Sequence, residues 1–106
     1  MIIKFEKEYL EELYTSGKSK NKKHTFQKSV IKKYVETINK LRPINRIEEL
    51  FPLHSLNYER LTGKKKHLES VKVNDQYRIE FRTSIEGEVP NCITICSIVE
   101  LSNHYK

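Results

Sequence analysis

The chain has 106 residues, of which 37% are hydrophobic and 32% charged, so it can build one domain around a modest core but not two. It has no run of about 20 apolar residues that would span a bilayer, and acidic residues follow its first apolar ones, which argues against a secretory signal. We therefore expect a cytoplasmic protein with reduced cysteines, and the net charge of +6 favours a polyanionic partner, although a domain can be basic without binding nucleic acid.

The first half of the chain has the pattern of a short strand followed by two helices. Residues 1–5 form a short apolar run, which we expect to be an edge strand. Apolar residues then recur at helical spacing up to Gly17, a typical helix stop, and a second helical stripe ends before Pro43. The first stripe is Phe5, Tyr9, Leu10, Leu13 and Tyr14, and the second is Val30, Ile31, Tyr34, Val35, Ile38 and Leu41. The lysine-rich residues 18–23 between them suit a loop, so the pattern predicts a helical hairpin.

The second half has the alternation of an antiparallel sheet. Residues 47–53 suit one short helical turn. Alternation around an Asn74-Asp75 turn then predicts a β-hairpin whose apolar face carries Val71, Val73, Tyr77, Ile79 and Phe81. After a turn over residues 84–90, a final strand is expected to carry Ile93, Ile95, Val99 and Leu101 on one face and Cys92, Thr94, Cys96, Ile98 and Glu100 on the other. This order predicts an α+β domain with its helices on one face of the sheet.

Basic residues gather in two clusters, and the acidic residues lie mostly elsewhere. The first cluster is Lys18, Lys20, Lys22, Lys23, Lys28, Lys32 and Lys33, and the second is Arg60, Lys64, Lys65, Lys66, His67, Lys72, Arg78 and Arg82. The first suits a solvated helix face as well as it suits a nucleic-acid surface. The second draws on a loop and on adjacent strands, so its charges can converge on one surface. Alternation places Lys72, Arg78 and Arg82 opposite the apolar face, where Arg78 has a salt bridge with Glu80 or Glu100 as its alternative role.

The segment 61–82, LTGKKKHLESVKVNDQYRIEFR, resembles the signature of HigB-type toxins of the RelE superfamily. That signature runs Leu-x-Gly, a few charged residues, Ser-Val-x-Val-Asn, a short gap and Arg-Ile-x-Phe. The matching residues are Leu61, Gly63, Ser70, Val71, Val73, Asn74, Arg78, Ile79 and Phe81. The family also ends in a strand with a short acidic-Tyr-His tail, and this chain ends in ELSNHYK. With the opening helices and the total length, the resemblance covers essentially the whole chain.

The resemblance implies a single toxin domain over residues 1–106 with a microbial-ribonuclease-like fold. In that fold an N-terminal helical hairpin packs on a curved, mainly antiparallel sheet. It also implies an endoribonuclease that cleaves mRNA in the ribosomal A site, with the RNA 2′-hydroxyl as nucleophile. The implied partner is a HigA-like helix-turn-helix antitoxin, and operator DNA would be contacted only through that antitoxin.

The resemblance also implies the catalytic residues, because the family arginine falls on Arg78 and the terminal histidine on His104. A histidine transfers protons near neutral pH, so we assign His104 general acid–base work, as the acid. Arg78 would stabilise charge on the phosphorus, and Tyr105 would position or stack on a base. The residues expected to bind RNA are Arg60, Lys64, Lys65, Lys66, Lys72 and Arg82.

The chain departs from the family pattern at three positions, and these departures leave the general base unassigned. Thr62 stands where many relatives have Lys, and Ser102 and Asn103 stand where relatives have an acidic residue and Tyr. A non-catalytic RNA- or ribosome-binding module therefore remains an alternative, as does a purely structural partner of a DNA-binding regulator.

No cofactor and no metal site is expected. Cys92 and Cys96 would lie about 13 Å apart on one strand face at ~3.3 Å per residue, too far for two ligands of one zinc ion. We expect both cysteines to be small buried residues.

Overall fold

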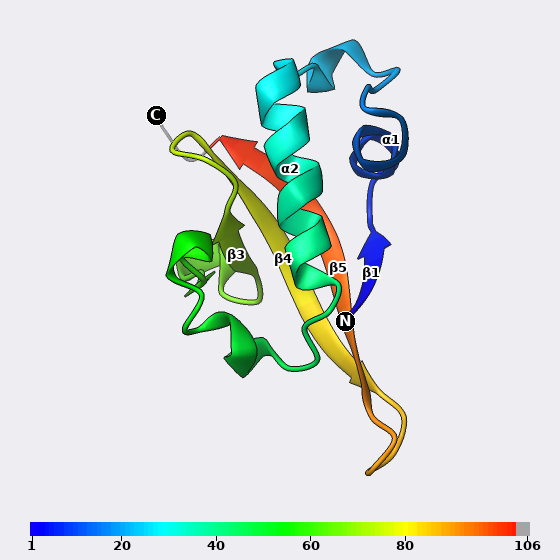
Figure 1. Cartoon of the computed structure of the whole chain (residues 1–106), viewed down its shortest axis with the longest axis vertical. Coiled ribbons are helices and arrows are strands. Elements are labelled where there is room, and N and C mark those ends of the chain that lie inside the picture. Colours follow the sequence, from blue (N-terminus) through cyan, green and yellow to red (C-terminus); the bar gives the residue numbers. More distant parts are fainter. Residues whose placement is uncertain (104–106) are drawn as a thin grey trace.

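Two helices and a mixed sheet make up the fold, and the computed structural model describes residues 1–103 (Figure 1). The helices cover one face of the sheet, and the long β4–β5 ribbon twists beneath them. The elements in chain order are β1 (Ile2–Phe5), α1 (Glu8–Ser16), η1 (Lys22–His24), α2 (Lys28–Leu41), η2 (Ile47–Leu50), η3 (His54–Leu56), β2 (Glu59–Arg60), η4 (Gly63–Lys65), β3 (Glu69–Lys72), β4 (Tyr77–Glu86) and β5 (Ile93–Asn103). The expected α+β class is confirmed.

The sheet has the strand order β1-β5-β4-β3-β2. β1 is an edge strand, as expected, and it pairs with β5 in parallel. The other neighbouring strands pair antiparallel. The sheet is therefore mainly antiparallel, with one parallel edge.

The two predicted helices form the expected hairpin. α1 ends at Gly17, whose backbone is left-handed (φ 76°) and whose N–H donates to the Leu13 carbonyl at 3.2 Å. α2 buries one stripe against the sheet and α1, namely Val30, Tyr34, Thr37, Ile38 and Leu41. The Tyr34 hydroxyl within this stripe donates to the Leu10 carbonyl at 2.7 Å, which ties the two helices together. Each fully buried aliphatic side chain in such a stripe stabilises the fold by about 1.5–3 kcal/mol.

The predicted faces of the last strand are wrong in its second half, because the register with β4 shifts between Glu80 and Phe81. Glu80 pairs with Glu100 and Phe81 with Ile98, so Val99 has no Cα partner. An extra residue of this kind, a β-bulge, reverses which side chains face the core. The residues of β5 that join the core are therefore Cys96, Ile98 and Leu101, and Val99 is only partly buried.

Three further features differ from expectation. β4 continues to Glu86, so residues 84–86, expected in a turn, pair with β5 instead. β2 was not expected, because a strand of two residues is too short to show alternation. The cysteines also differ: Cys96 is buried but Cys92 is exposed, since it lies just before β5 in the loop at the end of the ribbon.

None of the helices described within residues 1–103 is long and apolar enough to cross a membrane.

Candidate functional site

Arg78 lies on β4, on the sheet face turned away from α2, and is almost completely buried at 5% exposure. Its Nε donates to Ser70 Oγ at 2.9 Å, and its Nη2 donates to the Asn57 carbonyl at 2.6 Å. Asn57 follows η3 with a left-handed backbone (φ 43°), a conformation that asparagine tolerates better than most residues. Within residues 1–103 Nη1 makes no hydrogen bond, so it is the guanidinium nitrogen that remains able to donate to a ligand.

The carboxylate beside Arg78 belongs to Glu59 of β2, which the sequence reasoning did not single out. Glu59 Oε2 lies 3.8 Å from Arg78 Nη2, and about half of the Glu59 side chain is exposed. The ion pairs with Glu80 or Glu100 that the sequence suggested for Arg78 do not form. The pair joins residues 19 positions apart through a two-residue strand, so no local pattern predicts it.

The next carboxylates along the same face are engaged with other groups. Glu80 is buried, and both of its oxygens accept hydrogen bonds from Lys65 Nζ, at 3.1 and 2.9 Å. Glu100 accepts hydrogen bonds from the Tyr9 hydroxyl and from Lys7 Nζ, the latter at 3.3 Å. Burial and the bond to Glu100 raise the pKa of Tyr9 above its ordinary value, so this phenol stays protonated at neutral pH. Among residues 1–103, Glu59 thus has the most accessible carboxylate next to Arg78.

The residues expected to bind RNA do not all converge on Arg78. Lys65, in η4, contacts this face by pairing its ammonium with the Glu80 carboxylate. Lys64 and Lys66, its neighbours in sequence, are exposed. Lys72 is the Cα partner of Arg78, but its ammonium pairs with Asp75 in the adjoining turn at 2.9 Å.

The remaining two expected residues point elsewhere. Arg82 lies on β4 beyond the bulge and pairs with Glu6 at 2.7 Å. Arg60 is exposed and lines a separate groove on the helix side of the sheet. The predicted basic surface is therefore smaller than the sequence suggested, because several of its charges are paired within the chain.

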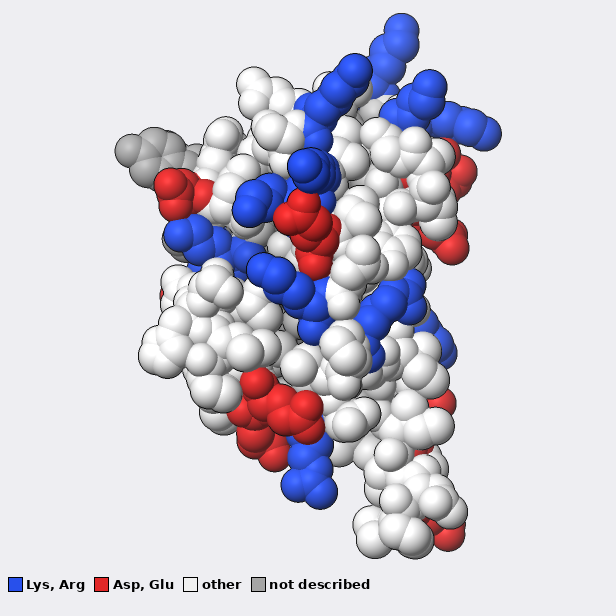
Figure 2. Space-filling model, viewed as in Figure 1, with Lys and Arg blue, Asp and Glu red and all other residues white. Residues whose placement is uncertain are grey.

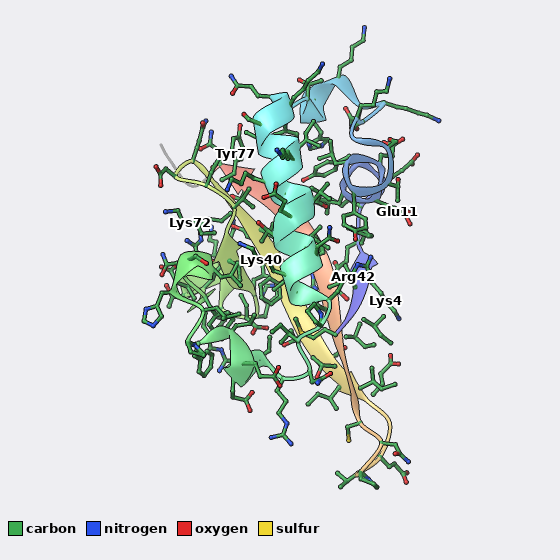
Figure 3. The ribbon with its side chains drawn as sticks, viewed as in Figure 1. Lys4, Glu11, Lys40, Arg42, Lys72 and Tyr77 are labelled. Atoms are coloured by element: carbon green, nitrogen blue, oxygen red, sulfur yellow. The ribbon has the colours of Figure 1, made fainter. Side chains whose placement is uncertain are left out.

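The expected catalytic residues His104 and Tyr105 lie outside the described residues. β5 ends at Asn103, which directly precedes His104 in the sequence and is the Cα partner of Tyr77. Ser102 is the Cα partner of Arg78. Figure 3 labels Lys72 and Tyr77, which mark the end of the sheet where β3 leads into β4. The last described residues of β5 thus lie beside Arg78.

The separate groove has a volume of about 670 Å³ and lies between η2, β2 and the β4–β5 ribbon. The Glu69 carboxylate at its floor accepts hydrogen bonds from Tyr58 at 2.5 Å and from Thr83 at 2.7 Å. Exposed apolar side chains border it, notably Phe51 and Ile85. Its polar floor is internally satisfied, so it offers no reactive group.

Within residues 1–103 no group of three or more His, Cys, Asp or Glu side chains is arranged to hold a metal ion. The described groups next to Arg78 can bind an anion and exchange a proton.

Comparison with known proteins gives a family match, matches among solved structures and one negative result. Residues 3–94 match the family model for the HigB-like toxin, described as the RelE-like toxin of the type II toxin–antitoxin system HigB. No curated protein matches the chain. Among solved structures, a YoeB/ParE toxin from Agrobacterium tumefaciens is similar, with 15% sequence identity and a TM-score of 0.55 over 99% of this chain and 100% of that one. At this identity the structural match shows the fold alone.

Proposed function

The chain belongs to the HigB-like family of RelE-like toxins from type II toxin–antitoxin systems, and from this premise we propose that it inhibits translation by cleaving mRNA in the ribosomal A site. Family membership also implies an antitoxin partner. The observation that supports cleavage best is the position of Arg78, buried and fixed by two hydrogen bonds next to the Glu59 carboxylate. A guanidinium fixed in advance stabilises developing negative charge without having to reorganise.

The proposed reaction is attack of the RNA 2′-oxygen on the adjacent phosphorus. Glu59 accepts the proton of the 2′-hydroxyl, the new oxygen–phosphorus bond forms, and the bond to the 5′-oxygen breaks. His104 donates a proton to the departing 5′-oxygen, so the products are a 2′,3′-cyclic phosphate and a 5′-hydroxyl. Arg78 Nη1 donates to a phosphate oxygen, and Tyr105 positions a base by stacking.

Glu59 acts as the general base, a role for which the resemblance to the family left no residue assigned. It is exposed enough to meet a ribose, and its distance of 3.8 Å from Arg78 places it next to any phosphate that Arg78 binds. The lysines of η4 and the residue after it, Lys64, Lys65 and Lys66, add positive charge on the approach to this site. We propose that the ribosome positions the message, since the chain itself presents few groups that could hold a substrate.

The partner that we propose is a HigA-like helix-turn-helix antitoxin, through which alone the complex would contact operator DNA. The toxin would act in the cytoplasm, where its ribosomal target is. A protein that is strongly basic on one surface pairs readily with a more acidic antitoxin.

The experiment is cleavage of a defined mRNA on purified ribosomes, read by primer extension. Arg78→Lys should lower the cleavage rate about 100-fold or more, because a lysine cannot reproduce the planar arrangement of donors. Glu59→Gln and His104→Ala should each lower it by a similar factor. Glu86→Gln is the matched control, since Glu86 is exposed at the far end of β4 and should leave the rate unchanged.

The alternative is a non-catalytic RNA- or ribosome-binding module, and it is favoured by the departures from the family pattern at Thr62, Ser102 and Asn103. A wild-type protein that binds ribosomes and blocks translation while the mRNA stays intact would establish this alternative. Normal cleavage by the folded Arg78→Lys and Glu59→Gln proteins would instead refute the assigned residues.

A further inference from the structure

The positive charge of residues 18–33 exceeds the net charge of the whole protein. It contains seven lysines and no acidic residue, while the net charge of the chain is +6, so the rest of the chain is slightly negative. We call these seven residues the lysine cap: Lys18, Lys20, Lys22, Lys23, Lys28, Lys32 and Lys33. Figure 2 shows basic side chains gathered at this end of the molecule, over the α1–α2 connection and the start of α2.

The side chains of the lysine cap are exposed and have no ion-pair partner within residues 1–103, unlike several cations of the second basic cluster. All seven side chains are exposed, and none forms an ion pair with any residue in 1–103. By contrast, the side chains of Lys65, Lys72 and Arg82 each form a close ion pair with a carboxylate of the chain itself. The charge that remains available to an external anion is therefore concentrated in the cap.

The start of α2 adds a second source of positive potential. The N-terminus of a helix carries a partial positive charge and favours acidic residues, yet the first turn of α2 has none and begins with Lys28. The Gln27 side chain does not cap the helix. The backbone N–H groups of Lys28 and Ser29 donate no hydrogen bond to residues 1–103. This arrangement is unfavourable for the isolated protein and is relieved by a bound anion.

The composition of the cap fits a nucleic-acid backbone better than a protein partner. The large hydrophobic residues exposed in the described chain all lie outside it, namely Ile2, Phe51, Leu53, Ile85, Val89 and Ile93. Lysine is depleted from the buried centres of protein interfaces. A surface of lysines without apolar contacts recognises phosphate groups through charge alone.

The form of the nucleic acid follows from the aromatic residues in the same segment. His24 stacks on Tyr9 with ring centres 3.7 Å apart, and Phe26 packs edge-on against Tyr77 at 5.5 Å. Both rings are only partly exposed, and none of the fully exposed side chains of residues 18–33 is aromatic, whereas proteins usually hold single-stranded RNA by stacking exposed aromatic rings on its bases. The cap thus suits the phosphates of a double helix.

We propose that the lysine cap binds the phosphate backbone of double-helical RNA. This surface is distinct from the Arg78 site, which lies on the sheet face turned away from α2. Naming the duplex as ribosomal RNA rests on the proposed function, whereas the binding of duplex RNA does not. The cap would hold the toxin on the ribosome while the Arg78 site acts on the message.

The test uses the full chain and a 20-base-pair RNA duplex of mixed sequence, with binding measured across a range of salt concentrations. The variant Lys22→Gln/Lys28→Gln removes two charges from the cap, and Lys4→Gln/Lys40→Gln removes two exposed charges elsewhere. Lys40 lies at the opposite end of α2 and Lys4 on β1 (Figure 3). The cap variant should bind roughly 50-fold more weakly at 0.1 M salt. The slope of log binding constant against log salt concentration should be smaller by about 2, because binding with two fewer phosphate contacts releases fewer counterions from the RNA. The control variant should bind as the wild type does.

Two results would overturn the inference. One is equal weakening in both variants, which would mean that net charge alone matters. The other is unchanged duplex binding in the cap variant; if that variant also loses its antitoxin, the surface is assigned to a protein. Because the duplex assay involves no cleavage, a wild type that leaves mRNA intact but binds duplex through the cap would refute the proposed function and sustain this inference.

Discussion

Replacing Lys28 with glutamine should stabilise the protein while weakening its binding to RNA. Lys28 is the first residue of α2 and meets the positive end of the helix dipole without an acidic neighbour in the first turn. Lys32 follows at the i+4 position, where a like charge is also unfavourable. Lysine and glutamine have nearly the same helix propensity, so the substitution isolates the charge.

The size of the effect follows from these two contributions. Relief of the dipole interaction is worth about 0.3–1 kcal/mol, and removal of the like-charge pair about 0.2–0.5 kcal/mol. For a domain of this size the sum corresponds to a rise in Tm of roughly 2–8 °C at low salt. Lys40→Gln, in the last turn of the same helix, should lower stability by about 0.3–1 kcal/mol, because a cation is favourable at that end.

Calorimetry at low and at high ionic strength measures both changes. The difference between the variants should shrink at 1 M salt, where the screening length falls to about 3 Å. A Lys28→Gln protein that is less stable than the wild type, or a gain that salt does not reduce, would refute the electrostatic reasoning about this helix.

Three other predictions follow from buried groups. A maleimide at pH 8 should modify Cys92 and spare Cys96 in the folded protein, because burial raises the pKa of the Cys96 thiol to about 12 and keeps it protonated; mass spectrometry that finds both thiols modified without unfolding would contradict this. Lys65→Met should destabilise the fold by about 1–2 kcal/mol, since it leaves the buried Glu80 carboxylate without its partner, and adding Glu80→Gln should recover part of that loss in urea unfolding. Burial raises the pKa of Tyr34 far above its ordinary 10.0, so stability should be unaffected by this group below pH 10 and fall above it, as the unfolded phenol ionises and the folded one does not; an absorbance titration that shows Tyr34 ionising near pH 10 in the native protein would disprove it.

The fold was largely predictable because its strongest signals are local. The stripe from Val30 to Leu41 repeats at the helical period, and that periodicity depends only on neighbouring residues. Val99 could not be placed, because the bulge opposite it depends on how β5 pairs with β4. A prediction from side-chain alternation assumes a regular strand, so one unpaired residue reverses the predicted face of every side chain that follows it.

The candidate site was predictable only where a motif carried it. Arg78 was identified from the Leu61–Arg82 resemblance, but its hydrogen bonds to Ser70 and Asn57, 8 and 21 positions away, depend on how the strands pair and on where the loop after η3 lies. Glu59 had no comparable signal, since a carboxylate beside Arg78 depends on β2 and β3 coming together. Ion pairing is likewise a tertiary property, which is why the sequence overestimated the free charge of the second cluster.

Both surfaces that we connect with RNA carry positive charge that the fold itself compensates poorly. Arg78 is buried, and within residues 1–103 its carboxylate partner Glu59 lies at 3.8 Å, too far for a hydrogen bond. The lysine cap surrounds a helix start that would favour an acidic residue. Selection for stability alone would remove such features, because most are reversible by one substitution. A bound phosphate would neutralise the positive charge at either surface, so one kind of ligand accounts for both unfavourable features. It follows that duplex RNA should raise the Tm of the wild type, and raise it less in Lys22→Gln/Lys28→Gln, because ligand binding stabilises only the state that binds it.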